Sequence, residues 1–478
     1  MNNKTLEKEN KMRNTPIGKL LFTMAIPAIF SMLVQALYNI IDSLYVSRIS
    51  DSNDELTALN YAFPIQMICL AISLGIGIGT SSIISRRLGE KDNTSANNAA
   101  NTGIILSIIA YMITLGCSFF VPQLFMKIYD DTDAIKQLSI SYLSIVMAFS
   151  IGSYLEVVIS KILQGTGNMI VPMISQLLGA ITNIILDPIF IFEPGQGIGL
   201  PFGLGLGVKG AAIATVIAQC LSGLFVTFII IFKKHQITFG FRHFKFMKII
   251  MNDIFSVGLS VTIMNSINAL TTIILNLILS SDGVTILGTY FKVQSFIFMP
   301  VFGLTQAAMP IMGYNFGAKS KTRFLKAIRL SLYSSLIVMM IGLLIFQFGA
   351  KEIANIFNFG ETTTPAIRAF KIISLCFIPA AISIIISSVF QAIGHGYKSM
   401  FMSLLRQAVI LIPCAILLKS LFHSDTGVWA AYPISELLCC ITFAIVAIFT
   451  LKKVLKTFDS PIPVSYTHLR AHETDSYL

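Results

Sequence analysis

Apolar residues recur along the chain in runs of about twenty, each long enough to cross the roughly 30 Å hydrocarbon layer of a bilayer as one helix. Strands of a membrane barrel would give short alternating segments instead. The pattern therefore predicts an all-α polytopic membrane protein with twelve transmembrane helices. The predicted spans lie near residues 20–46, 61–84, 102–125, 138–160, 170–192, 211–232, 249–279, 288–312, 327–348, 366–390, 399–421 and 428–451.

The composition supports this class and excludes several others. Hydrophobic residues make up 55% of the 478 residues and charged residues only 12%, which is too little polar surface for a soluble protein of this size. The seven cysteines lie in apolar runs, without the Cys-x-x-Cys spacing of a metal or redox site. The chain also lacks a phosphate-binding lysine motif and a catalytic or zinc-binding set. We therefore expect no enzyme, no cofactor and no structural metal.

The distribution of positive charge predicts the orientation of the chain. Lys and Arg sit in short segments between the apolar runs, 22 on the side that holds both termini and 6 in the opposite loops. Because cytoplasmic loops are enriched in Lys and Arg, both termini should lie in the cytoplasm. The net charge of +11 thus reflects membrane topology. We expect a multi-pass protein of the cytoplasmic membrane that contacts the lipid bilayer and binds no nucleic acid.

The first half of the sequence recurs in the second half. Residues 36–47 match 269–280 at an offset of 233, 63–91 match 291–319 at 228, 164–178 match 391–405 at 227, and 207–233 match 427–453 at 220. Each half holds six predicted spans, an even number, so the copies insert in the same orientation as parallel repeats. Two such six-helix bundles with a cleft between them are the usual basis of alternating-access transport.

The repeat and the polar segments predict five parts of the chain. They are a cytoplasmic N-terminal segment at 1–19, an N-lobe at 20–232, a cytoplasmic linker at 233–248, a C-lobe at 249–451 and a C-terminal tail at 452–478. The end of the tail is polar and aperiodic, and we expect it to be disordered or foreign to the native protein. We expect the chain to work as a monomer.

Ionisable residues inside the predicted spans are few, and each is costly to bury in a bilayer. They include Asp42, Glu156, Asp187, Lys292, Arg406 and Glu436. Glu156 and Lys292 lie near span ends, where such side chains usually reach the interface. Arg406 and Glu436 lie deeper, and a structural ion pair and a ligand contact are both open for them.

Polar residues gather on one face of span one and one face of span five. Gln35, Tyr38 and Asp42 are spaced by three and four residues, and Asn183 and Asp187 by four, so each set shares a helical face. Both spans run outwards from the cytoplasm, and both acids lie towards their outer ends. The two carboxyl groups are therefore predicted to lie at similar depth in the N-lobe.

A hydroxyl from span six, Thr215, and the amide of Gln219 can reach the same depth. Oxygen ligands of this kind suit Na⁺, and two nearby carboxyl groups in a low dielectric also suit proton carriage, because one of them then favours its protonated form. In the alternative reading, Asp42 and Asp187 only reach the outer interface or cap helix ends. The repeat argues against this alternative, because neither acid recurs at the matching position of the second half.

Several segments together resemble the multidrug and toxic compound extrusion family. The resemblance rests on AIPAIFSMLVQALYNIIDSLYVSRIS, LQGTGN, TNIILDPIFIF, GVKGAAIATVIAQ, LLRQAVILIPCAILL and GVWAAYPISE, and it covers the chain to about residue 456. It is nearest to the bacterial branch with a cation site in the N-lobe. It implies two six-helix lobes in a V and the antiport of small organic, often cationic, compounds against H⁺ or Na⁺.

The resemblance also implies residue roles. Pro27 matches the bending proline of span one, Asp42 its essential acid, and Gln35 and Tyr38 positions that line the substrate cavity. The remaining coupling positions implied in this way are Asn183, Asp187 and Thr215. The chain departs from the family where Gln164 replaces an arginine, and the second-lobe acids of another branch are not evident. Neutralisation of the two acids is expected to bend span one and release the substrate outwards.

Four other functions compete with drug export. A lipid-linked oligosaccharide flippase of the same superfamily would usually carry extra spans and a more cationic cavity, and a narrow-substrate metabolite exporter would share the fold. A major-facilitator uptake carrier would carry a GxxxDRxGRR-like loop, where this chain has RRLGEKDNT. A membrane-bound transferase would need a catalytic constellation that the sequence lacks.

Overall fold

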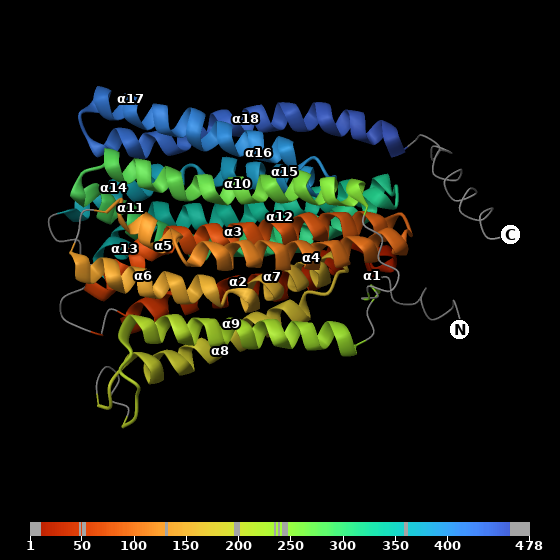
Figure 1. Cartoon of the computed structure of the whole chain (residues 1–478). Helices are drawn as coiled ribbons and strands as arrows, with labels where there is room; N and C mark the ends of the chain where they lie inside the picture. The colour runs from red at the N-terminus through yellow and green to blue at the C-terminus, as the bar shows by residue number, and fades with distance from the viewer. Residues whose placement is uncertain are drawn as a thin grey trace.

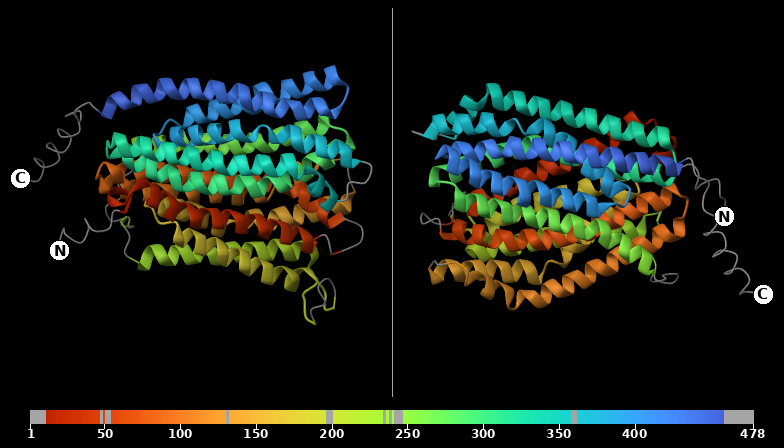
Figure 2. Two further views of the ribbon diagram at one scale, coloured as in Figure 1. Left: turned by 180° about the vertical axis from the view of Figure 1, so that it is seen from behind. Right: turned by 90° about the horizontal axis from the view of Figure 1, so that it is seen from above.

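The computed structural model describes residues 11–46, 49, 54–129, 132–195, 201–233, 236–237, 240, 247–357 and 362–458. Predicted segments that lie outside the described residues are the first ten residues, most of the linker and the tail beyond residue 458. Every regular element among the described residues is a helix, and the long helices run side by side along one axis (Figures 1 and 2).

The first half of the chain forms the helices drawn from red to yellow-green in Figure 1. After the short α1 (Lys11–Asn14) they are α2 (Ile17–Val46), α3 (Asp54–Gly89), α4 (Asn93–Ser118), α5 (Val121–Met126), α6 (Asp133–Ala148), α7 (Ile151–Gly165), α8 (Ile170–Ile191) and α9 (Gly207–Phe232). The fourth predicted span is broken, because α6 and α7 meet at an angle of 51°.

The second half forms the helices drawn from green to blue. They are α10 (Lys248–Ile278), α11 (Ser281–Gly317), α12 (Lys321–Phe348), α13 (Ala350–Ile356), α14 (Thr363–Ser374), α15 (Phe377–Ala392), α16 (Gly396–Leu404), the π-helix η3 (Leu405–Leu411), α17 (Ile412–Phe422) and α18 (Asp425–Phe458). The tenth predicted span is bent like the fourth, by 43° between α14 and α15.

The number of membrane-crossing helices agrees with the sequence. Among the described residues, ten helices are long and apolar enough to span a bilayer, and the two bent pairs raise the number to twelve. Large apolar side chains such as Phe22, Ile113 and Leu277 are exposed on the outside of the bundle, as expected where lipid covers the surface. The chain is therefore a multi-pass helical membrane protein.

The repeat seen in the sequence extends to backbone conformation. Gly167 and Gly394 occupy matching turns and have φ angles of +89° and +82°. Lys91 and Lys319 also match, and both adopt the left-handed conformation, at φ 63° and 50°. A lysine rarely adopts this conformation. Its recurrence at equivalent helix ends shows that both halves use the same turn geometry.

Both described ends of the chain lie at the same end of the bundle, here named the terminal end; the opposite end is named the far end (Figure 1). Arg323, at the start of α12, donates to the carbonyl oxygens of Met12 and Thr15 at 2.8 Å each. The ring of Phe458 at the end of α18 packs on Phe324, with centroids 5.6 Å apart. An even number of spans requires this arrangement.

The two halves share one hydrophobic core at the terminal end and have separate cores at the far end. The largest buried cluster joins first-half residues such as Ile162 to second-half residues such as Ile311 and Phe443. Two further clusters each belong to one half, around Leu143 in the first and Phe370 in the second. The halves therefore hold together mainly through their terminal ends.

Glycines allow the close approach that this shared core needs. A Cβ atom added at Gly75 of α3 would lie 2.5 Å from the carbonyl oxygen of Gly258 in α10, and one added at Gly258 would lie 2.8 Å from that of Gly75. No side chain fits at such a distance, so the two backbones touch directly. The Gly75-x-Gly-x-Gly stretch is thus a helix-packing motif, as its place inside a span predicts.

We expect Gly75→Ala to destabilise the folded protein by about 1–3 kcal/mol, because the added methyl group must push α3 away from α10. The measurement is thermal unfolding in detergent, monitored by light scattering or circular dichroism. Gly116→Ala in α4 is the matched control, because no atom lies within 4 Å of its added Cβ. Equal melting temperatures for the two variants would contradict the packing role of Gly75.

Candidate functional site

The candidate site lies in the first half, where α2, α8 and α9 pack together. Small polar residues hold α8 and α9 close. The hydroxyl of Ser175 donates to the carbonyl oxygen of Ser222 at 3.2 Å, and the hydroxyl of Ser222 donates to that of Ser175 at 3.0 Å. These reciprocal bonds fix the register of the two helices, which places the predicted polar residues of α8 and α9 at the same depth.

Asn183, Asp187 and Thr215 form a hydrogen-bonded group across α8 and α9. The amide Nδ2 of Asn183 donates to Oδ1 of Asp187 at 3.0 Å and reaches Oγ1 of Thr215 at 3.4 Å. All three side chains are buried, with exposed fractions of 1%, 0% and 2%. The spacing of four between the two α8 residues thus brings them into direct contact, as the sequence predicts.

Helix α2 completes the group from the opposite side. The carboxyl group of Asp42 lies close enough to that of Asp187 to share a hydrogen bond. The hydroxyl of Tyr38, one turn earlier on α2, lies near that of Thr215. Two acids more than a hundred residues apart in the sequence are therefore neighbours inside one half of the protein.

One further polar residue borders the acids and was not predicted, Tyr142 of α6. It is 2% exposed and lies near both acids, and its hydroxyl lies beside Gln66 of α3. Gln66 carries a signal in the sequence, because it belongs to a repeated block and matches Gln294. Tyr142 carries none, since a tyrosine in a span is usually part of the packing.

Among the residues that the structure describes, no hydrogen-bond donor reaches three buried oxygen atoms of this group. They are Oδ1 of Asp42, Oδ2 of Asp187 and Oδ1 of Asn183. Buried oxygens without a partner are rare in folded proteins. Carboxyl and amide oxygens are the ligands that a small hard cation prefers, and a carboxyl pair can instead hold a proton. The residues present therefore fit a proton or a cation such as Na⁺.

The other predicted residues of α2 and α9 lie apart from this contact. Pro27 is inside α2, about four turns before Asp42, and the helix continues through it. Gln35 lies two turns before Asp42 on the same face and is half-buried. Gln219 is one turn after Thr215, and its amide oxygen is buried without a partner. A role of these three residues would therefore not depend on direct contact with the acids.

The remaining charges inside the spans divide into two kinds. Lys292 is exposed, in line with a side chain that reaches the interface. Glu156 faces the protein, where the hydroxyl of Ser160 donates to its carboxylate at 2.9 Å. Arg406 and Glu436 form an ion pair, with Nη1 and Oε1 separated by 3.5 Å. This pair resolves the open reading of the sequence in favour of a structural contact.

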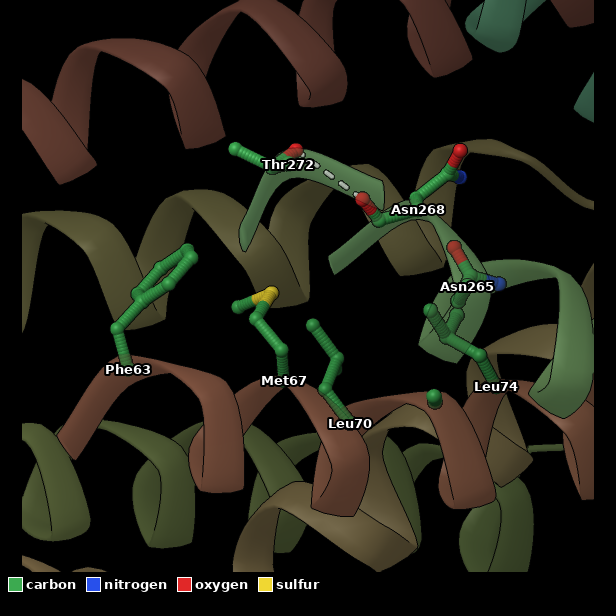
Figure 3. Close-up of a pocket in the computed structure, with 8 residues that line it drawn as sticks. Phe63, Met67, Leu70, Leu74, Asn265, Asn268 and Thr272 are labelled. Carbon is green, nitrogen blue, oxygen red and sulfur yellow. Dashed lines mark hydrogen bonds between the residues drawn. The ribbon is translucent and has the colours of Figure 1, made fainter. Parts of the chain in front are cut away.

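A cavity of about 270 Å³ lies between the halves, beyond the crossing of α3 and α10 (Figure 3). One wall is apolar and comes from α3, whereas the other is polar and comes from α10. The lining residues are Phe63, Met67, Leu70, Ala71, Leu74, Asn265, Asn268 and Thr272. None of them is charged. The cavity begins next to Gly75, where the close contact between α3 and α10 ends. The packing motif therefore forms one end of the cavity.

Comparison with known proteins agrees with this fold. The family model described as MatE matches residues 27–189 and residues 257–417, which is more than half of the chain. The chain belongs to the MatE family. The first matched region contains Asp42, Asn183 and Asp187. Membership in this family of transporters agrees with the expectation that the chain is no enzyme.

Curated relatives of this MatE chain are bacterial exporters. The multidrug export protein MepA of Staphylococcus haemolyticus is 26% identical over 433 residues, which cover 88% of this chain and 91% of the relative. MepA of Staphylococcus aureus strain NCTC 8325 is 26% identical over 439 residues, covering 89% and 92%.

Solved structures share the fold of the MatE chain closely. A MATE protein in the straight conformation gives a TM-score of 0.87 at 25% identity, over 94% of this chain and 99% of that one. The bent conformation gives 0.85 at 25% identity, over 95% and 99%. A MOP superfamily transporter from Pyrococcus furiosus, described as having reversed pocket polarity and a different function, gives 0.86 at 25% identity, over 94% and 98%.

We expect Asp187→Asn to leave the protein folded and to reduce the pH dependence of its stability. With one carboxyl group replaced by an amide, the pair can no longer carry two negative charges in a buried site. The melting temperature of the variant should therefore change less with pH than that of the wild type. An equal change of melting temperature with pH in the two proteins would show that the acids do not interact.

Proposed function

We propose that this MatE chain is a secondary active exporter of small organic compounds, driven by H⁺ or Na⁺ entering through the N-lobe. The observation that carries the proposal is the contact between Asp42 and Asp187, with three buried oxygen atoms around it that lack a donor. The bacterial relatives named for multidrug export support the substrate class. We place the chain in the cytoplasmic membrane with both termini inside, as the Lys and Arg bias predicts, and expect it to act as a monomer.

The buried acids supply the coupling. Two carboxylates in contact repel each other and are poorly solvated, so the group gains stability when a proton or a small cation arrives. Asn183 and Thr215 position the acids, because their side chains connect α8 to α9 and, through Tyr38, to α2. The arrival of a positive charge thus alters the contact between α2 and α8.

Helix α2 can pass this change along its length. Pro27 has no backbone N–H, so the helix lacks one internal hydrogen bond at the carbonyl of Thr23 and bends there at lower cost than elsewhere. A shift of Asp42 towards or away from α8 would therefore be taken up at Pro27. The bend would move Gln35 and Tyr38, which the resemblance places in the substrate cavity, and so release a bound compound. The N-lobe at 20–232 and the C-lobe at 249–451 would then move relative to each other, each as a rigid body.

The cavity between the halves fits a further part of the substrate. Phe63 and Met67 offer an adaptable apolar wall, which suits varied flat compounds. The amide Nδ2 of Asn265 donates to the carbonyl of Val261 at 2.9 Å. Its amide oxygen accepts no hydrogen bond from the described residues and is then available to a ligand. Because the lining is uncharged, positive charge on a substrate would be recognised at the acids instead.

One comparison keeps a second function open. The Pyrococcus furiosus transporter shares the fold at a similar TM-score and is described as having a different function. A lipid-linked oligosaccharide flippase or a narrow-substrate metabolite exporter therefore remains the alternative. The uncharged lining of the cavity favours organic-compound export over a flippase, whose diphosphate substrate would need positive charge.

We expect Asp42→Asn to lower efflux of an ethidium-like cation by about tenfold or more, because the amide cannot take up the coupling charge. The measurement is efflux from pump-deficient cells, with Na⁺ and pH gradients imposed separately. Whichever gradient drives the wild type identifies the coupling ion. Asp282→Asn, at the start of α11, is a control outside the site. Wild-type efflux by Asp42→Asn would refute the coupling role, and no efflux by well-expressed wild type would favour the alternative functions.

We expect Asn265→Leu to weaken the apparent affinity for compounds with a hydrogen-bond donor by about fivefold, the effect of one lost hydrogen bond. Compounds without such a group should be exported as before. Stability should change little, because the side chain donates only within its own helix. The measurement is a comparison of KM for matched pairs of substrates. An equal loss for both members of a pair would argue against a direct contact.

A further inference from the structure

A buried lysine, Lys161, links the two halves below the cavity. It lies on α7, six residues before Gly167, whose turn approaches Met12 at the terminal end. Its Nζ donates to Oε1 of Gln164 at 3.0 Å and to Oε1 of Gln306 at 2.8 Å. Gln306 belongs to α11 in the second half, so the second bond crosses from one half to the other.

The surroundings of this lysine are built to admit it. A Cβ added at Gly77 of α3 would lie 2.8 Å from Cγ of Lys161, so the missing side chain leaves the path along which the lysine passes. Lys161 is only 6% exposed and Gln164 only 5%. The middle glycine of the Gly75-x-Gly-x-Gly stretch therefore serves this lysine, whereas Gly75 serves the contact with α10.

The lysine is weakly compensated for a buried positive charge. Its two hydrogen-bond acceptors are neutral amide oxygens. The nearest acid is Glu156, whose carboxylate already accepts a bond from Ser160. Removing a cation from water costs several kcal/mol, and neutral acceptors return less of this cost than a carboxylate would. Lys161 is therefore less stable in the closed arrangement than an apolar side chain of the same shape.

The remaining contacts between the halves at the terminal end are ordinary in comparison. The hydroxyl of Ser82 donates to the carbonyl oxygen of Gln391 at 2.6 Å, and Arg86 lies 3.8 Å from Asp253. Together with the shared hydrophobic core, these contacts would hold the halves closed. An exporter that must also open towards this end needs a feature that limits their combined strength.

We propose that Lys161 limits the stability of the closed terminal end, so that the two halves can separate there during transport. Separation removes Gln306 and admits water, which solvates the ammonium group and recovers the cost of burying it. Gln306 and Gln164 reduce this cost enough for the closed state to form. The inference rests on the proposed function in one respect, namely that the halves alternate between two open ends.

The two partners of one hydrogen bond should then act in opposite directions. Lys161→Met keeps the packing on Gly77 but removes the buried charge, so the closed state should gain population over the open state by about tenfold. Gln306→Leu leaves the charge buried with one acceptor fewer, so the open state should gain by about tenfold. If the bond only tied the halves together, both substitutions would favour the open state.

The experiment measures the distance between spin labels at Thr94 and Thr322, exposed residues near the starts of α4 and α12 at the terminal end. The full-length protein is used in lipid nanodiscs, with the accessible native cysteines replaced. The expected result is a smaller long-distance population for Lys161→Met and a larger one for Gln306→Leu. Lys161→Gln should shift in the same direction as Lys161→Met, but less, and serves if the methionine variant does not fold.

Three results would overturn the proposal: a shift of both partners towards the open state, no shift in either, or an equal shift in Lys326→Met, whose lysine is exposed on α12. The distances do not depend on substrate. Opposite shifts in a protein that exports no tested compound would therefore retain the role of Lys161 and reject the exporter assignment alone. A protein that showed neither the opposite shifts nor export would reject alternating access itself.

Discussion

The contact between α3 and α10 at Gly75 and Gly258 determines how the rest of the molecule is arranged. The two backbones touch there, so the halves of the chain are fixed to each other near the terminal end. From this point α3 and α10 diverge, and the cavity lined by Phe63 and Asn265 lies between them. The separate cores at the far end follow from the same divergence. One close crossing thus gives both a joint between the halves and the cavity beside it.

The constraint also explains why polar groups occur where they do. In a bilayer, a charge must find its partners within the protein. Asp42 and Asp187 find each other and a set of amide and hydroxyl groups inside one half, whereas Arg406 and Glu436 neutralise each other in the second. The two halves share a backbone plan and differ in electrostatics. The asymmetry places the proposed coupling reaction in the first half and leaves the second as its counterpart.

Much of this arrangement could be predicted from the sequence. Apolar runs gave the spans because their length is set by the bilayer, and helical periodicity placed Asn183 and Asp187 on one face. The bend between α14 and α15 has a signal in the sequence, because Pro379, the third residue of α15, has no N–H to donate to the carbonyl of Leu375. The bend between α6 and α7 could not be predicted in this way, since neither helix contains a proline. Tyr142 was missed because its role depends on which helices become neighbours. Glu156 was expected at the interface, yet it turns inwards to Ser160, a choice made by packing.

The buried charges at the two levels of the molecule can be considered together. In the first half, two acids in contact favour whichever state supplies a positive charge. Below the cavity, Lys161 favours whichever state admits water, because the oxygens that accept its hydrogen bonds within the described part of the chain are neutral amides. On the proposed cycle, opening at the far end would expose the acids to incoming cations while Lys161 is dehydrated. Opening at the terminal end would hydrate Lys161 while the acids are shielded. Each state then carries one poorly solvated group, and burying that group costs free energy in both states. Neither state therefore becomes so stable that the exporter stops in it.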